Sequence, residues 1–165
     1  MNDQQSAAQF ILLTEAMQAN GFEHYEISNF CQPGQYSKHN SNYWKGVKYL
    51  GIGPSAHSYN GEARQWNIAN NAKYIQAIEQ SKITAEVEIL TERDRLNEYV
   101  MTSLRTIWGL DLSKLNTIAP AAATELLIAA QTYFEREWIH QKDNIIYLTP
   151  TGKLYADAIA AALFF

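Results

Sequence analysis

Cysteine is almost absent from this sequence of 165 residues, in which Cys31 is the only one. A disulfide needs a pair of cysteines, and zinc or iron–sulfur sites built from thiolates need more than a pair. The chain by itself can therefore supply none of these. Long apolar runs are also missing, since residues 10–13 and 158–165 fall far short of the roughly 20 residues that cross a bilayer. A membrane-spanning helix is not expected.

Basic residues are too few for binding to nucleic acid or anionic lipid through general charge attraction. Lys and Arg number 13 against 17 Asp and Glu, which gives a formal net charge of -4. A basic, apolar signal segment is not visible either, so we expect a cytoplasmic location. What the sequence does have is a hydrophobic share of 47%, which is enough for a folded core and excludes general disorder.

The first half of the chain has the pattern of helices and strands around a long connection. Apolar residues at three- and four-residue steps predict an amphipathic helix over residues 6–17, ended by Gly21. Residues 29–46, rich in Asn and Ser, predict a long loop of the kind that is functional or mobile. The other expected elements are strands at 22–27, 49–53 and 63–68 and a helix over 69–80. They cover part of a sheet and cannot close a barrel alone.

The second half, from Thr91 onward, is expected to be mainly helical. Thr91 and the acidic residues after it predict the start of a helix that Gly109 ends. The elements expected after it are a short helix over 112–116, a long helix from Pro120 to Trp138, a hairpin of 139–142 and 145–148 turned by Asp143-Asn144, and a last helix from Thr149-Pro150 to about Leu163. This is a winged-helix order, and the whole chain is expected to be of the α+β class.

Three neighbouring segments carry the residues of unusual type. They are EISNF-x-x-PG over residues 26–34, HN-x-x-YW over residues 39–44 and YLGIGPSAHSY over residues 49–59. Two histidines, an adjacent Tyr-Trp pair and a glycine-rich segment would suit a flat apolar ligand. Together these motifs resemble the oxygen-independent coproporphyrinogen III oxidase-like branch of the radical S-adenosylmethionine (SAM) proteins, and within it the HemW-type haem chaperones. The ISNF and HN-x-x-YW stretches distinguish the chaperone-like members from the true oxidases.

The resemblance covers nearly the whole chain and implies its organisation. Residues 1–85 would be the C-terminal part of a partial β/α (radical SAM) barrel with the HN-x-x-YW loop, and residues 86–165 a winged-helix-like domain similar to the HemN C-terminal domain. The family holds a [4Fe-4S] cluster, which binds SAM, on a Cys-x3-Cys-x2-Cys motif that has no counterpart here. We therefore expect a C-terminal part of a longer parent, with Met1 a chosen or misassigned start, and no catalytic turnover by this chain alone.

The resemblance also implies where haem would bind. His39 is the haem-linked position of the family motif, and Tyr43 completes that motif. A neutral imidazole nitrogen is a good axial ligand of haem iron, so His39 is the candidate metal ligand. Tyr43 and Trp44 would provide flat apolar surface for the macrocycle, and Lys38 and Lys45 could meet its propionates.

A second candidate site follows from the glycine-rich segment, which the family places beside SAM. Gly51 and Gly53 would allow close approach of the backbone, with Ala56 and His57 lining the site. Simpler roles stand beside these. A loop histidine is commonly a surface or hydrogen-bonding residue, the Tyr-Trp pair could anchor the loop on a core, and Cys31 could be a small packed side chain.

Three functions compete. The leading one is that of a HemW-like protein that binds haem and passes it to an acceptor protein. The alternative is porphyrin biosynthesis by a parent oxidase that decarboxylates coproporphyrinogen III. The third is a winged helix that binds DNA, but residues 111–165 carry four basic and six acidic residues, so phosphates would be repelled and no nucleic-acid partner is expected.

Overall fold

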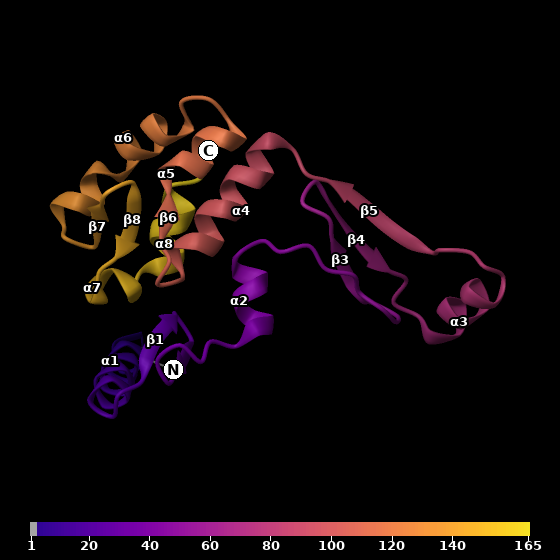
Figure 1. Cartoon of the computed structure of the whole chain (residues 1–165), viewed down its shortest axis with the longest axis horizontal. Helices are drawn as coiled ribbons and strands as arrows, with labels where there is room; N and C mark the ends of the chain where they lie inside the picture. The colour runs from indigo at the N-terminus through magenta and orange to yellow at the C-terminus, as the bar shows by residue number, and fades with distance from the viewer. Residues whose placement is uncertain (1–2) are drawn as a thin grey trace. The chain divides into compact units, whose positions relative to one another are not determined.

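The computed structural model describes residues 3–165, which divide into two compact units. The first comprises the chain up to Lys45 together with Leu96–Phe165, and the second comprises Gly46–Arg95. Figure 1 labels their helices and strands. Every pair of neighbouring strands in the described residues is antiparallel. The mixture of helices with small sheets confirms the expected α+β class.

Most of the first unit is a winged helix. Its elements are α4 (Glu92–Leu104), β6 (Leu110–Asp111), α5 (Leu112–Ile118), α6 (Ala122–Glu135), β7 (Ile139–Lys142), β8 (Ile145–Leu148), α7 (Pro150–Lys153) and α8 (Ala156–Ala162). The strands form a sheet in the order β6-β8-β7, and Figure 1 shows it among the helices α4, α5, α6 and α8. The helix order and the hairpin are those that the sequence predicts.

A single apolar core joins these helices and the sheet. Val100 on α4, Leu115 on α5 and Ile146 on β8 have no exposed surface, and the side chains of α6 and α8 pack into the same cluster. Burying a side chain of this size stabilises a fold by roughly 1.5–3 kcal/mol. The winged helix is therefore the well-packed platform of the first unit.

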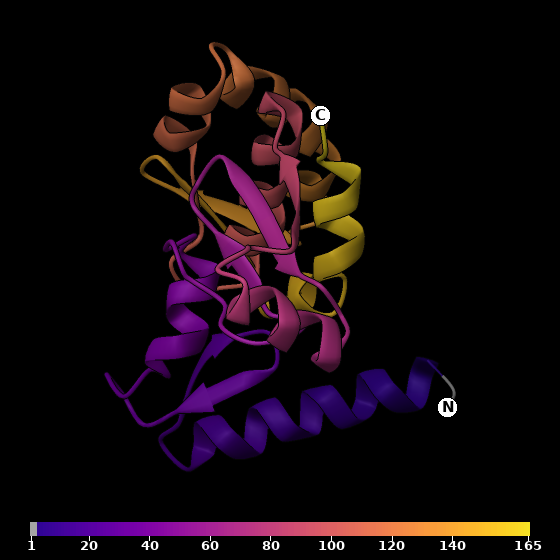
Figure 2. The ribbon, with the colours of Figure 1, turned by 90° about the vertical axis from the view of Figure 1, so that its right-hand side faces the viewer.

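The remainder of the first unit precedes this platform in sequence. It consists of α1 (Asp3–Ala19), β1 (Glu23–Glu26), β2 (Asn29–Cys31) and α2 (Lys38–Trp44). Gly21 has φ +78°, the left-handed conformation with which glycine ends a helix. Figure 2 shows α1, in indigo, extending well beyond the hairpin that follows it. Accordingly, none of its described side chains is buried, and Leu12 is 68% exposed. The predicted helix is confirmed, but its apolar residues are covered only in part, as by the packing of Phe10 against His24.

The second unit is a three-stranded sheet with one helix. Strands β3 (His57–Tyr59), β4 (Ala63–Asn67) and β5 (Ala85–Ile89) lie in the order β3-β4-β5, and α3 (Asn71–Glu79) connects the last two. The side chain of Asn70 caps α3 by accepting a hydrogen bond from the Lys73 amide. Strand β4 and helix α3 are the predicted strand and helix of this region. Strands β3 and β5, which pair with β4 on its two sides, were not predicted.

Several boundaries differ from the prediction for local reasons. The expected loop over 29–46 contains β2 and α2. The apolar run 49–53 forms no strand, and within it only Tyr49 pairs, with Tyr59. The long helix ends at Glu135 rather than at Trp138 because Glu137 has φ +56°, which no α-helix accommodates. The last helix is interrupted after Lys153, where the Tyr155 ring stacks on Trp138 at 4.3 Å.

One further finding concerns membranes. Among residues 3–165, no helix combines the length and the hydropathy that a bilayer crossing requires.

Candidate functional site

The HN-x-x-YW motif forms the helix α2, although the sequence pattern predicts a loop there. The Ser37 side chain begins the helix by accepting a hydrogen bond from the Asn40 amide, at 3.4 Å. Residues four positions apart share a helix face, so His39 and Tyr43 lie on one side. Both are exposed, Tyr43 by 52% of its surface, whereas Ser41 is buried on the other side. The structure thus brings the two predicted haem residues together and leaves them open to solvent.

The imidazole of His39 is available for a ligand. No other residue in the described part of the chain hydrogen-bonds to it. The ring of Tyr43 lies edge-on to that of Trp44, with 5.1 Å between the centroids. A free imidazole nitrogen beside an aromatic surface suits an iron porphyrin, which takes one axial nitrogen and stacks flat on apolar groups.

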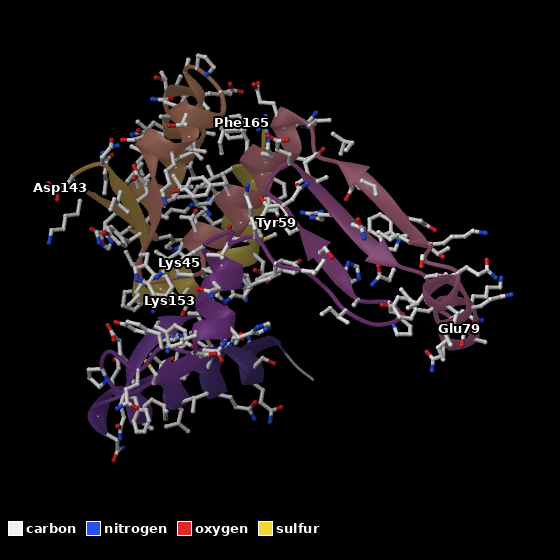
Figure 3. The ribbon with its side chains drawn as sticks, turned by 45° about the vertical axis from the view of Figure 1, so that its right-hand side comes forward. Lys45, Tyr59, Glu79, Asp143, Lys153 and Phe165 are labelled. Atoms are coloured by element: carbon white, nitrogen blue, oxygen red, sulfur yellow. The ribbon has the colours of Figure 1, made fainter. Side chains whose placement is uncertain are left out.

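Cations hold the inner face of α2 against the winged helix. The Nζ atom of Lys45 lies 3.9 Å from the ring centroid of Trp108, and the guanidinium carbon of Arg105 lies 5.2 Å from that of Trp44. Tyr36 packs edge-on against Trp108 at 5.5 Å. Lys45, labelled in Figure 3, is therefore already engaged. Both lysines expected to meet propionates are exposed, Lys45 at the end of α2 and Lys38 beside His39, and their role stays a prediction.

Two buried polar atoms on α2 have no hydrogen-bond partner among the described residues. They are the Oγ of Ser41 and the Nε1 of Trp44. A buried polar atom without a partner costs roughly 1–3 kcal/mol, so such atoms mark places where a further polar group would be stabilising. These atoms are buried, whereas His39 and Tyr43 are exposed, so the fit of α2 to an iron porphyrin rests on the donor chemistry of the imidazole and not on them.

The EISNF motif has a structural role that the sequence analysis missed. The carboxylate of Glu26, which is 2% exposed, accepts hydrogen bonds from the Ser28 amide and the Asn29 side chain. It also pairs with Arg105, whose Nη2 lies 3.1 Å from Oε1. The signal was the conjunction of Glu, Ser and Asn in one short turn, which are the residue types that satisfy a buried carboxylate. The motif therefore fastens the hairpin to the end of α4.

Cys31, at the end of β2, is half-buried. Burial, and then the negative charge of Glu23, raise the pKa of the Cys31 thiol. Metal binding and nucleophilic attack both require the thiolate, which a raised pKa disfavours. This fits the simpler interpretation of Cys31 as a packed side chain.

The glycine-rich segment of the second unit is held by side chains of the same unit. The Gly51 amide donates to Ser58 Oγ at 3.0 Å, and the Gly53 amide donates to the Tyr74 hydroxyl at 3.2 Å. The side-chain amide of Asn67 donates to the carbonyl oxygen of Gly53 at 2.9 Å. A Cβ at Gly51 would meet the His57 carbonyl oxygen at 2.1 Å, so only glycine fits there. Both glycine amides are thus used within the chain, and neither is left to donate to a ligand.

The two remaining candidates of this segment lie just beyond it. The Ala56 carbonyl accepts a hydrogen bond from the Asn67 amide at 3.0 Å, which anchors the loop to β4. His57 is the exposed first residue of β3, with its ring 6.2 Å from that of Trp66 across the sheet. Gly51, Gly53, Ala56 and His57 therefore lie together in the second unit, and a SAM contact at these residues stays a prediction.

Comparison with known proteins places the chain in a class. Residues 90–155 match the model of the HemN C-terminal domain, which is the winged helix described above. In structure, the chain is similar to the coproporphyrinogen III oxidase HemN of Escherichia coli, described as a radical SAM enzyme, with a TM-score of 0.65 over 92% of this chain and 40% of that chain. Their sequence identity is 19%, so this likeness shows the fold alone.

The curated relatives are more specific. The chain is 29% identical to the haem chaperone HemW of Bacillus subtilis (strain 168), over 96% of this chain and 42% of that protein. It is 31% identical to HemW of Mycobacterium tuberculosis (strain CDC 1551 / Oshkosh), over 98% of this chain and 40% of that protein. The resemblance to the HemW-type haem chaperones of the coproporphyrinogen oxidase-like radical SAM proteins is confirmed. The chain spans about two fifths of the length of these relatives.

The donor set of this chain does not fit the iron–sulfur cluster of the radical SAM family. Such a cluster needs three thiolates from the protein, and the chain has Cys31 alone. We therefore derive no radical step from the residues of this chain. A boundary between a barrel part and the winged helix near residue 85 stays a prediction.

Proposed function

We propose that this chain carries the haem-binding helix of a HemW-like haem chaperone, with His39 as the axial ligand of the iron. The observation that supports this most strongly is the placement of His39 and Tyr43. They lie one helical turn apart on the solvent face of α2, and the imidazole is not hydrogen-bonded by any other described residue. When bound, haem would supply the iron and the planar macrocycle.

His39 and the residues around it would each make a different contact with haem. The imidazole nitrogen would donate its lone pair to the iron, and the ring of Tyr43 would offer apolar surface to the macrocycle. Lys38, in the first turn of α2, offers an ammonium group to a propionate. The partner in function would be an acceptor protein that takes the haem onward. The likeness to the oxidase is one of fold, so it does not favour the decarboxylation of coproporphyrinogen III over haem binding.

A spectral titration with haemin tests the proposal. The purified chain should shift the Soret band of haemin on binding, and His39→Ala should weaken the affinity at least tenfold, because the axial bond is lost. His140→Ala is the matched control, since His140 is an exposed histidine on β7. Equal affinity of the wild type and His39→Ala would overturn the assignment of His39.

Tyr43→Leu separates stacking from ligation. It keeps the imidazole and removes the aromatic ring, so the Soret maximum should stay that of an imidazole complex while the affinity falls several-fold. An unchanged affinity would show that Tyr43 does not cover the macrocycle.

A further inference from the structure

An open cavity of about 580 Å³ lies in the first unit, and none of the residues that line it belongs to α2. Phe22, Pro33 and Ile107 give it apolar walls, and Glu23, His24 and Lys153 bring ionisable groups to it. Lys153 is the last residue of α7, and Figure 3 shows it next to the hairpin of β1 and β2. The cavity thus combines an amine with an apolar surface.

The amine of Lys153 is held by neutral groups only. Its Nζ lies 3.2 Å from Nδ1 of His24 and 3.4 Å from the carbonyl oxygen of the same residue. No carboxylate of the described residues lies within ion-pair distance of Nζ. Lysines that are fully buried are almost always paired, and burial of an unpaired charge is unfavourable. Lys153 is a half-buried cation without a counter-ion.

The protonation of His24 follows from its contacts. Its Nε2 atom lies 3.0 Å from the carbonyl oxygen of Ile27, which can only accept, so Nε2 carries the hydrogen. Nδ1 is then the acceptor for Lys153, and the ring is neutral. Burial lowers the pKa of His24 and also that of Lys153, which agrees with a neutral imidazole and with a charged amine that lacks compensation.

One acid lines the cavity, Glu23, and it is not within ion-pair distance of Lys153. The carboxylate of Glu23 accepts a hydrogen bond from the Tyr36 hydroxyl at 2.8 Å. An ammonium group has three N–H donors, and His24 accepts two of them, which leaves one for a partner in the cavity that Lys153 lines. A carboxylate is the natural partner, because it neutralises the charge and forms a strong charge-assisted hydrogen bond.

We propose that this cavity binds an organic carboxylate, with the carboxylate on Lys153 and the apolar body of the ligand against Phe22 and Ile107. The site is separate from the proposed haem ligand and does not depend on it. An apolar wall beside a single cation favours an amphipathic acid over a small inorganic anion.

Calorimetric titration with octanoate tests the site. Octanoate should bind the wild-type chain at least tenfold more tightly than 1-octanol or inorganic phosphate, since only octanoate satisfies both the cation and the apolar wall. Lys153→Met should lose at least tenfold in octanoate affinity. Lys142→Met is the matched control, because Lys142 is an exposed lysine on the β7 hairpin, and it should bind like the wild type. Equal binding of octanoate and octanol, equal binding of phosphate, or full binding by Lys153→Met would each overturn the proposal.

A second measurement needs no variant and so stands even if Lys153→Met folds poorly. Acetylation of the wild-type lysines by an activated acetate ester is followed by mass spectrometry of peptides, with and without octanoate. The ligand should slow acetylation of Lys153 at least threefold and leave that of Lys142 unchanged. An unchanged rate at Lys153 would contradict the site.

Discussion

At the scale of single residues, one motif supports the fold and another carries the residues that we propose bind haem. The Glu26 carboxylate of the EISNF motif accepts hydrogen bonds from Ser28 and Asn29 and pairs with Arg105. These contacts hold the hairpin of β1 and β2 in place. His39 and Tyr43 face solvent and contribute little to the stability of the fold. The EISNF motif and the HN-x-x-YW motif therefore differ in what they contribute to stability, and substitutions should separate them.

Removing one partner of the buried ion pair should destabilise the fold strongly. Arg105→Met leaves the Glu26 carboxylate buried without its cation, and we expect a loss of about 3–5 kcal/mol in the free energy of unfolding. Urea denaturation followed by circular dichroism measures this. Arg93→Met, at an exposed position, should stay within about 0.5 kcal/mol of the wild type. If the double variant Glu26→Gln/Arg105→Met were no more stable than Arg105→Met, the buried charge would not be the cause.

The stability of the first unit should depend on the protonation of His24. Burial lowers the pKa of His24 below the ordinary histidine value of 6.5, so the unfolded chain takes up the proton first as the pH falls. Stability from this residue is therefore present above pH 6.5 and is lost as the pH falls below it. His24→Gln cannot titrate and should lose less stability than the wild type between about pH 7 and pH 5 in urea denaturation. His140→Gln, at an exposed site, should follow the wild type, and a wild-type slope in His24→Gln would refute the assignment.

At the scale of elements, the sequence predicted what local signals determine. The hairpin of β7 and β8 has the predicted residues at both strands, because Asp143 adopts the positive φ of 54° that its turn requires. The start of α4 was predicted as well. Elements fixed by distant contacts were missed: β6 is two residues long and is defined only by its pairing with β8. The helix α2 was predicted as a loop, because it is short and its packing on Trp108 and Arg105 cannot be read from local periodicity.

The same reasoning applies to the candidate site. The motif pairs His39 with Tyr43, but their common helix face could not be predicted, because it requires the helix α2. The roles of Gly51 and Gly53 could not be predicted either, since the partners of their amides, Ser58 and Tyr74, lie up to 21 positions away. The sequence singled out these segments, whose role as sites stays a prediction, and it left their geometry open.

The start of α4 offers a direct test of a local signal. The Thr91 hydroxyl accepts a hydrogen bond from the Asp94 amide at 3.1 Å, and the Asp94 carboxylate accepts one from the Thr91 amide at 2.9 Å. Thr91→Ala should cost about 1 kcal/mol of unfolding free energy, measured by thermal denaturation. Thr117→Ala removes only a hydroxyl that bonds back to the Ser113 carbonyl within α5, and it should cost no more than a few tenths of a kcal/mol. Equal effects would show that Thr91 does not act as a cap.

At the scale of the whole molecule, a winged helix invites comparison with DNA-binding domains. The charge of this chain argues against that use, because its formal net charge is -4 and residues 111–165 are acidic on balance. Fluorescence anisotropy with a labelled duplex at about 150 mM salt should therefore show no binding in the micromolar range. Measurable binding that weakens with added salt would contradict this prediction and would support DNA binding by the winged helix.

The central claim is that His39 ligates haem iron, and the ligand field of the iron reports on it most directly. The ferric haem complex of the chain is examined by pulsed electron paramagnetic resonance with ¹⁵N-histidine labelling. The account predicts an imidazole nitrogen coupling in the wild type and in His140→Ala, and its loss in His39→Ala. If the coupling persists in His39→Ala, or is absent from the wild type, His39 is not the ligand.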